Sequence, residues 1–123
     1  MSEGANGSVS SEPVSFFRIV RTNPPTVEDF KSYIALGLRP PPSLPSDQLR
    51  QWEGISVFAT ANQARRQARR FPQFGGFIAE LKIAAGSEVE VRRTNPRSHG
   101  HHTIWADPEV VRHTVVRVVA VEQ

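Results

Sequence analysis

The first strong pattern along the chain is an alternating run of side chains at residues 15–21, SFFRIVR. A period of two is typical of a β-strand, whose successive side chains point to opposite faces of a sheet. Both faces of this segment are largely apolar, so we expect a central strand. Arg18 interrupts one of these faces. It must reach a sheet edge or find a partner, because burial of an unpaired charge is costly.

A helical pattern follows the Asn-Pro-Pro break at residues 23–25. Thr26 can cap the helix, with Asp29 as a weaker form of the capping box. We expect this helix to end at Gly37 and to bury a stripe made of Val27, Phe30 and Ile34. The proline-rich run at residues 39–45 predicts a stiff connector. A ligand for a proline-binding domain is the alternative, and it is disfavoured because the run lies inside the fold.

Two further helices and a strand are predicted in the middle of the chain. Ser46 can cap a short helix that ends at Gly54 and buries Leu49 and Trp52. Residues 55–59, ISVFA, predict a strand. Thr60 then caps the clearest helix of the chain, with Gln63 completing a capping box and with Ala64, Ala68 and Phe71 facing inward.

The second half of the chain predicts more strands. Residues 77–83 alternate cleanly, and residues 88–92 are expected to be their antiparallel partner. Residues 94–102 predict a polar loop, Asp107 caps a short helix, and residues 114–121 predict an interior strand because they are almost all β-branched. This order predicts one α+β domain over residues 14–123. It would have a mostly antiparallel twisted sheet and three to four helices, behind a disordered tail at residues 1–13.

Composition narrows the function classes. The chain has no cysteine, which excludes disulfides, thiolate zinc sites and cysteine nucleophiles. The absence of cysteine also suggests a reducing compartment, so we expect a cytoplasmic protein. No apolar run approaches the roughly 20 residues of a membrane helix, so we expect no membrane partner. Of the 15 basic residues, 13 are arginines, which suit the recognition of phosphates and carboxylates. A compositional bias of the genome explains the same excess and is the favoured interpretation.

Two clusters are candidates for other functions. The helix after Thr60 carries outward-facing arginines at two i,i+4 spacings: Arg65, Arg66, Arg69 and Arg70. They could bind nucleic acid or an acidic protein, so that the chain would be a non-enzymatic binding module. A solvated helix face is favoured, with an acidic group nearby to offset the repulsion.

The second cluster is the histidine-rich stretch HGHHT at residues 99–103. His99, His101 and His102 suggest a metal site or a phosphoryl-handling enzyme. Adjacent histidines point apart in an extended chain, and no fourth ligand is evident, so we expect no metal.

Several short segments together resemble the ADP-ribosyltransferase fold, including RES-type toxins and related small bacterial transferase domains. They are FFRIV, a helix ending in GL, GISVFAT running into an alanine-rich helix, and FIAEL. The resemblance implies an enzyme that takes NAD as donor and modifies an unknown macromolecular acceptor. In this family an arginine or histidine lies on the first core strand, and a serine, threonine or tyrosine lies on a strand that leads into a helix.

By this resemblance, Arg18 would bind the pyrophosphate or ribose hydroxyls, and Ser56 and Thr60 would hold the second position. The family's acid on a later strand has no obvious counterpart here. Glu109, at a helix start, is the candidate acid, and it joins Arg18 and Ser56 as a catalytic candidate. The remaining candidate cofactor-binding groups are His101 and His102.

We therefore expect Arg18 and Ser56 to lie on neighbouring strands and to line one pocket, on the same face or at the same edge. The alternative for Arg18 is a structural ion pair, for instance with Glu80 or Glu90.

Overall fold

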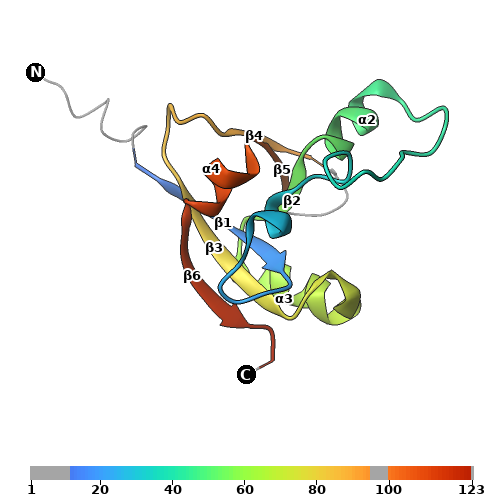
Figure 1. The fold of residues 1–123 in the computed structure, drawn as a ribbon. Helices are drawn as coiled ribbons and strands as arrows, with labels where there is room; N and C mark the ends of the chain where they lie inside the picture. The colour runs from blue at the N-terminus through green and yellow to red at the C-terminus, as the bar shows by residue number, and fades with distance from the viewer. Residues whose placement is uncertain (1–11, 95–99, 123) are drawn as a thin grey trace, which may run out of the picture.

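The fold is that of a computed structural model, which describes residues 12–94 and 100–122. It is an α+β domain with one six-stranded sheet of order β4-β5-β2-β1-β3-β6, in which every strand pairs antiparallel with its neighbours (Figure 1). The strands are β1 (Val14–Val20), β2 (Ile55–Phe58), β3 (Phe77–Ile83), β4 (Glu90–Arg93), β5 (His101–Trp105) and β6 (Val115–Ala120). The helices are α2 (Ser46–Trp52), α3 (Ala61–Arg70) and α4 (Pro108–Arg112), with the short 3-10 helices η1 (Val27–Phe30) and η2 (Pro72–Phe74).

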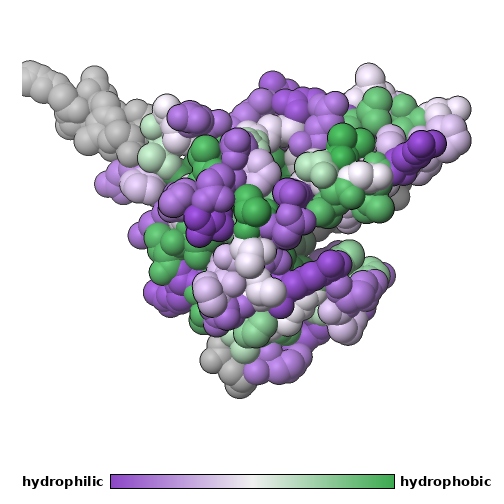
Figure 2. Space-filling view, viewed as in Figure 1, coloured by the Kyte–Doolittle hydropathy of each residue, from purple (hydrophilic) through white to green (hydrophobic). Residues whose placement is uncertain are grey.

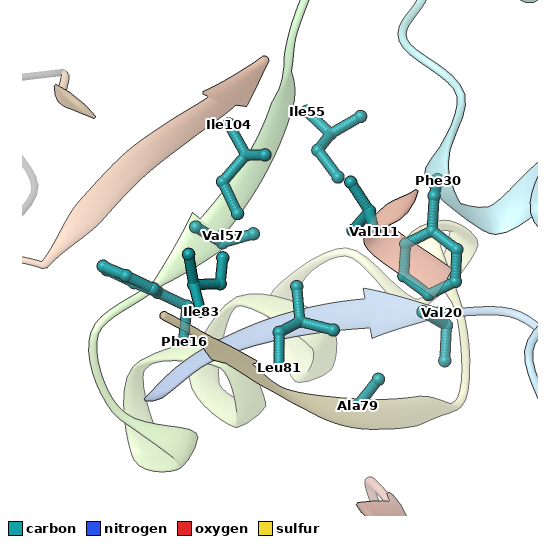
Figure 3. Close-up of a cluster of buried hydrophobic side chains, with 10 residues drawn as sticks. All are labelled: Phe16, Val20, Phe30, Ile55, Val57, Ala79, Leu81, Ile83, Ile104 and Val111. Carbon is teal, nitrogen blue, oxygen red and sulfur yellow. The ribbon is translucent and has the colours of Figure 1, made fainter. Parts of the chain in front are cut away.

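The two faces of the sheet bury separate apolar clusters. On one face, Phe30 of η1 and Val111 of α4 pack on strand residues such as Leu81, as Figure 3 shows. On the other face, the core-facing side chains of α3 pack on Phe58 and Ile78. The sheet is therefore covered by η1 and α4 on one side and by α3 on the other, and this layering matches the predicted α+β class.

β1 is central, as the sequence predicted. It lies between β2 and β3, with seven residue pairs to β3 but one pair, Phe17 with Phe58, to β2. The strands β1 and β2 therefore part from each other soon after Phe17.

The prediction of a helix from Thr26 to Gly37 is wrong in its length. Only the 3-10 helix η1 forms, and Lys31 directly after it is extended (φ −85°, ψ 138°). Phe30 is buried, but Ile34 is 41% exposed, so the stripe has no core to pack on beyond η1. The predicted capping box is nevertheless present, because the Asp29 carboxylate accepts a hydrogen bond from the Thr26 amide; it accepts a second one from the Arg21 amide.

The helix α2 forms, but it buries no side chain, contrary to the prediction for Leu49 and Trp52. Leu49 is 38% exposed, and the Trp52 ring packs at a tilt against Tyr33 with ring centroids 5.0 Å apart. Pro45 occupies the N-cap position that was predicted for Ser46. This helix stands away from the sheet in Figure 1, which explains why its apolar positions stay at the surface.

The pairing of the C-terminal strands also differs from the prediction. β4 pairs with β5, not with β3, and β5 begins at His101, inside the stretch predicted to be a loop. β6 was expected to be interior but lies at the edge of the sheet, with Val116 56% exposed. The predicted tail, residues 1–13, lies outside the described residues except for Glu12 and Pro13, which are exposed.

Candidate functional site

A cleft of about 560 Å³ opens where β1 and β2 part. In Figure 2 it is the notch on the right, between the part of the surface that carries α2 and the part that carries α3. Its lining includes Arg18 of β1, Ser56 of β2 and His101 of β5, together with residues of η1, α2 and α3. A second hollow of about 460 Å³ is lined only by Thr60 and polar residues of α3. The cleft is the stronger candidate site, because residues of seven elements, including Phe74 of η2, line it.

Arg18 lies at the floor of the cleft without a carboxylate partner. Its Nε donates to the Asp29 carbonyl oxygen and its Nη1 to the Ser56 carbonyl oxygen, both at 2.8 Å. Within residues 12–94 and 100–122, no carboxylate forms an ion pair with this guanidinium, and no hydrogen bond engages Nη2. The residue keeps partial solvent exposure along the cleft.

Burial is the largest influence on the Arg18 charge. It lowers the pKa of Arg18 to about 10, although the nearby Asp29 carboxylate opposes the shift. At neutral pH the guanidinium is still protonated. The cleft thus holds a desolvated positive charge with an unused hydrogen-bond donor.

The structural ion pair considered for Arg18 does not form. Glu80 accepts a hydrogen bond from Ser15 at 2.9 Å and lies 3.8 Å from Arg117. Glu90 pairs with arginines of α2 and β4. Both carboxylates are therefore engaged elsewhere.

Ser56 and His101 form a hydrogen-bonded pair. The His101 Nε2 lies 3.1 Å from the exposed Ser56 hydroxyl, and its Nδ1 lies 2.8 Å from the Thr94 hydroxyl. The Thr94 hydroxyl in turn lies 2.8 Å from that of the buried Thr103. The ring of Phe58 packs edge-on against the imidazole with centroids 5.6 Å apart. These contacts fix the orientation of the imidazole.

The imidazole of His101 is biased toward its neutral form. Burial is the main cause that lowers the pKa of His101. A hydrogen bond with the Thr94 backbone raises this pKa, and the neighbouring His102 lowers it. A neutral imidazole can accept a proton, so His101 can serve as a base at neutral pH.

Arg18 and Ser56 lie on neighbouring strands and line the same cleft, as predicted. Their side chains nevertheless leave the sheet on opposite faces. Phe17 is paired with Phe58, so Ser56 shares the face of Phe17, and Arg18 lies on the other one. Of the two arrangements that we expected, a common face is therefore not found. Both residues reach the cleft because it lies at the end of the pairing between the two strands.

The rest of the lining combines cations with apolar surface. The cleft contains four basic residues, Arg18, Arg21, Lys31 and Arg70, and two acidic ones. Glu28 is paired with Lys31 at 2.6 Å, and the Asp29 carboxylate is occupied by the loop after β1. The apolar part of the lining includes Ile19, Tyr33, Leu36, Phe58 and Phe74. Such a site suits an anionic ligand that also carries rings.

Three of the predicted site residues lie outside the cleft lining. Thr60 caps α3 by accepting a hydrogen bond from the Gln63 amide, which confirms the predicted capping box. His102 points to the opposite face from His101 and packs on Phe16 with ring centroids 5.0 Å apart. Glu109 is on α4, where it pairs with Arg112 and His113. The Arg112 hydrogen bond is the main cause that lowers the pKa of Glu109.

The four arginines of α3 do not form one surface. Arg70 lines the cleft, whereas Arg65 donates to the Val121 carbonyl oxygen at 3.2 Å and Arg69 pairs with Glu122 at 3.2 Å. Glu122 is the acidic neighbour that the repulsion within the helix predicted. Arg66 is exposed and lines only the hollow along α3.

Several site residues were missed by sequence reasoning. Arg21 carried a usable signal, because it is an arginine at the end of a strand already predicted to form the site, whereas Arg70 was predicted only as part of the alternative arginine surface. Thr94 and Tyr33 carried none, because their roles depend on which segments fold next to them. His99 lies outside the described residues.

Among the residues that the structure describes, no group of three or more His, Asp or Glu side chains could hold a metal ion. No helix in the same part of the chain is long and apolar enough to cross a membrane. Comparison of the chain with protein-family models, with curated proteins and with solved structures finds no match.

Proposed function

We propose that the cleft binds NAD and that the chain is a small ADP-ribosyltransferase-like domain acting on a macromolecular acceptor. The observation that carries the proposal is Arg18. A desolvated guanidinium without a carboxylate partner is costly, and an anionic ligand would offset this cost. The short segments that resemble the transferase fold include the strands that bear Arg18 and Ser56.

The cleft has groups for both chemical parts of NAD. Arg18 is the primary ligand for the pyrophosphate through its unused Nη2, and Arg21 and Arg70 supply further positive charge in the same lining. Tyr33, whose ring packs at a tilt of 58° against Trp52, offers an aromatic surface for a base. A volume of about 560 Å³ is within the range of small-molecule and cofactor sites.

Cleavage of the nicotinamide bond develops positive charge on the ribose, which a carboxylate in the site stabilises. Glu109 lies outside the cleft lining. Glu28 lines the cleft and keeps 61% of its side chain exposed beside Lys31. We therefore assign the stabilising role to Glu28 in place of Glu109.

Calorimetric titration with NAD tests the proposal, together with an assay of nicotinamide release. Arg18→Met should abolish measurable binding, because it removes the charge and keeps a long apolar side chain. Arg70→Gln should weaken binding, and the matched control Arg66→Gln, on the same helix but outside the cleft, should leave the dissociation constant unchanged. Failure of the wild-type chain to bind NAD, or equal weakening by both glutamine variants, would contradict it.

A further inference from the structure

The Ser56–His101 pair has the geometry of an activated nucleophile. The distance of 3.1 Å between the Ser56 hydroxyl and His101 Nε2 lies within the range of nucleophile–base pairs. A third group orients the base in such pairs, and here the Thr94 hydroxyl holds Nδ1 at 2.8 Å. Two side chains that each bound a ligand separately would not need to be hydrogen-bonded to each other in this way.

The hydrogen-bond chain is consistent with a base at Nε2. If Nδ1–H donates to Thr94, the Thr94 hydroxyl is left to donate to Thr103, which satisfies that buried hydroxyl. Nε2 then carries a lone pair directed at Ser56. In this tautomer the Thr94 hydroxyl accepts from Nδ1–H, as a carboxylate does in other serine–histidine pairs.

Ser56 is also accessible. Its residue is exposed, and it lines the cleft together with His101 and Arg18. A serine hydroxyl that merely supported the fold would not need a base fixed from a strand 45 positions further along the chain.

We propose that Ser56 is itself an acceptor, which attacks the NAD bound in the cleft and becomes ADP-ribosylated in cis. This inference rests on the proposed function. The Ser56 Oγ forms a bond to C1 of the nicotinamide ribose, and the bond from C1 to the nicotinamide nitrogen breaks. Nicotinamide leaves as a neutral molecule with the electron pair of that bond, and the proton of the serine hydroxyl passes to His101 Nε2.

Incubation of the full chain with NAD, followed by intact-mass and peptide mass spectrometry, tests this step. We expect one ADP-ribosyl group per chain, located on Ser56. Ser56→Ala should remove the label, and the control Ser87→Ala, in the exposed turn after β3, should retain it. His101→Ala should slow labelling by about a hundredfold or more, as is typical when a general base is lost.

The pH dependence of labelling separates a base from a structural histidine. The rate should fall as the pH falls through the His101 pKa, which burial holds below its ordinary value. The neighbouring His102 also lowers the pKa of His101, and the hydroxyl partners of His101 carry no charge. A pH-independent rate would contradict the role of His101.

Calorimetry on the same samples distinguishes the two proposals. NAD binding without covalent label on Ser56, or label only at other residues, would overturn this inference and leave the proposed function standing. Absence of NAD binding would overturn both.

Discussion

At the residue scale, Arg18 combines an unfavourable and a favourable contribution to folding. Burial disfavours its charge, as the lowered pKa of about 10 indicates, while its two hydrogen bonds satisfy the Asp29 and Ser56 carbonyl oxygens. Each contribution is of the order of 1–3 kcal/mol, and the two have opposite signs.

We therefore expect Arg18→Met to change the free energy of unfolding by less than about 2 kcal/mol, because the two contributions offset each other. Leu81→Ala, in the fully buried core, should cost about 2–5 kcal/mol and serves as the reference. Urea denaturation of both variants measures the difference. A loss for Arg18→Met as large as that for Leu81→Ala would mean that the arginine is a structural element and not a ligand-binding one.

His101 gives the stability of the fold a dependence on pH. Its pKa is lower in the folded chain than the unfolded value of 6.5, so the unfolded chain binds more protons in the interval between the two values. Stability should consequently fall as the pH falls from about 6.5 through the folded pKa. Thermal unfolding from pH 7.5 to 5 measures this slope, and His101→Gln should flatten it. An unchanged slope in the variant would exclude His101 as its source.

The sequence showed Arg18 because a charge within an apolar strand is conspicuous in one dimension. It also placed Ser56 on a strand near Arg18. It could not show the hydrogen-bonded pair of Ser56 and His101, because this contact depends on the pairing of β2 with β5. Nothing in the sequence of either strand specifies the other as its partner. Face assignment failed for a similar reason: alternation fixes the faces within each strand, but only the pairing of Phe17 with Phe58 relates the two strands.

At the element scale, capping signals were more reliable than apolar stripes. Thr60 and Gln63 begin α3 as predicted, because a capping box is satisfied locally. The stripe with Ile34 predicted a long helix, but a stripe stabilises a helix only where a core is available. β5 was missed because the polar residues at its start, His101 and His102, do not have the composition of a buried strand.

Gly54, between α2 and β2, is required by close packing and not by a left-handed backbone. A Cβ at this position would lie 2.5 Å from Thr103 Cγ2 and 2.8 Å from the Ile104 carbonyl oxygen. Gly54→Ala should therefore destabilise the chain by about 1–3 kcal/mol, the usual range for overpacking. Gly76→Ala is the matched control, because a Cβ there meets nothing within 4 Å. Chemical denaturation of both variants provides the comparison, and equal stability of the two would refute the close contact.

At the scale of the whole molecule, the α+β class could be predicted from the order of elements, but the order of strands could not. Alternation predicted that residues 77–83 form a strand, yet nothing in that segment specifies β1 and β6 as its neighbours. The cleft depends on this strand order, because it brings His101 of β5 next to Ser56 of β2. The sequence predicted the cleft from Arg18 and Ser56 alone, without knowledge of the strand order that forms it.

The position of β6 at the end of the sheet has a consequence for the behaviour of the protein at high concentration. Among the described strands it pairs with β3 alone, and its sequence, VVRVVA, has the composition of segments that add to the edges of other sheets. Arg117 is the single charge in this strand, exposed at the surface and held 3.8 Å from Glu80. A charge at such a place acts as a gatekeeper against self-association. Arg117→Val should leave NAD binding intact but lower the concentration at which light scattering first detects aggregates, whereas Arg117→Lys should behave as the wild type.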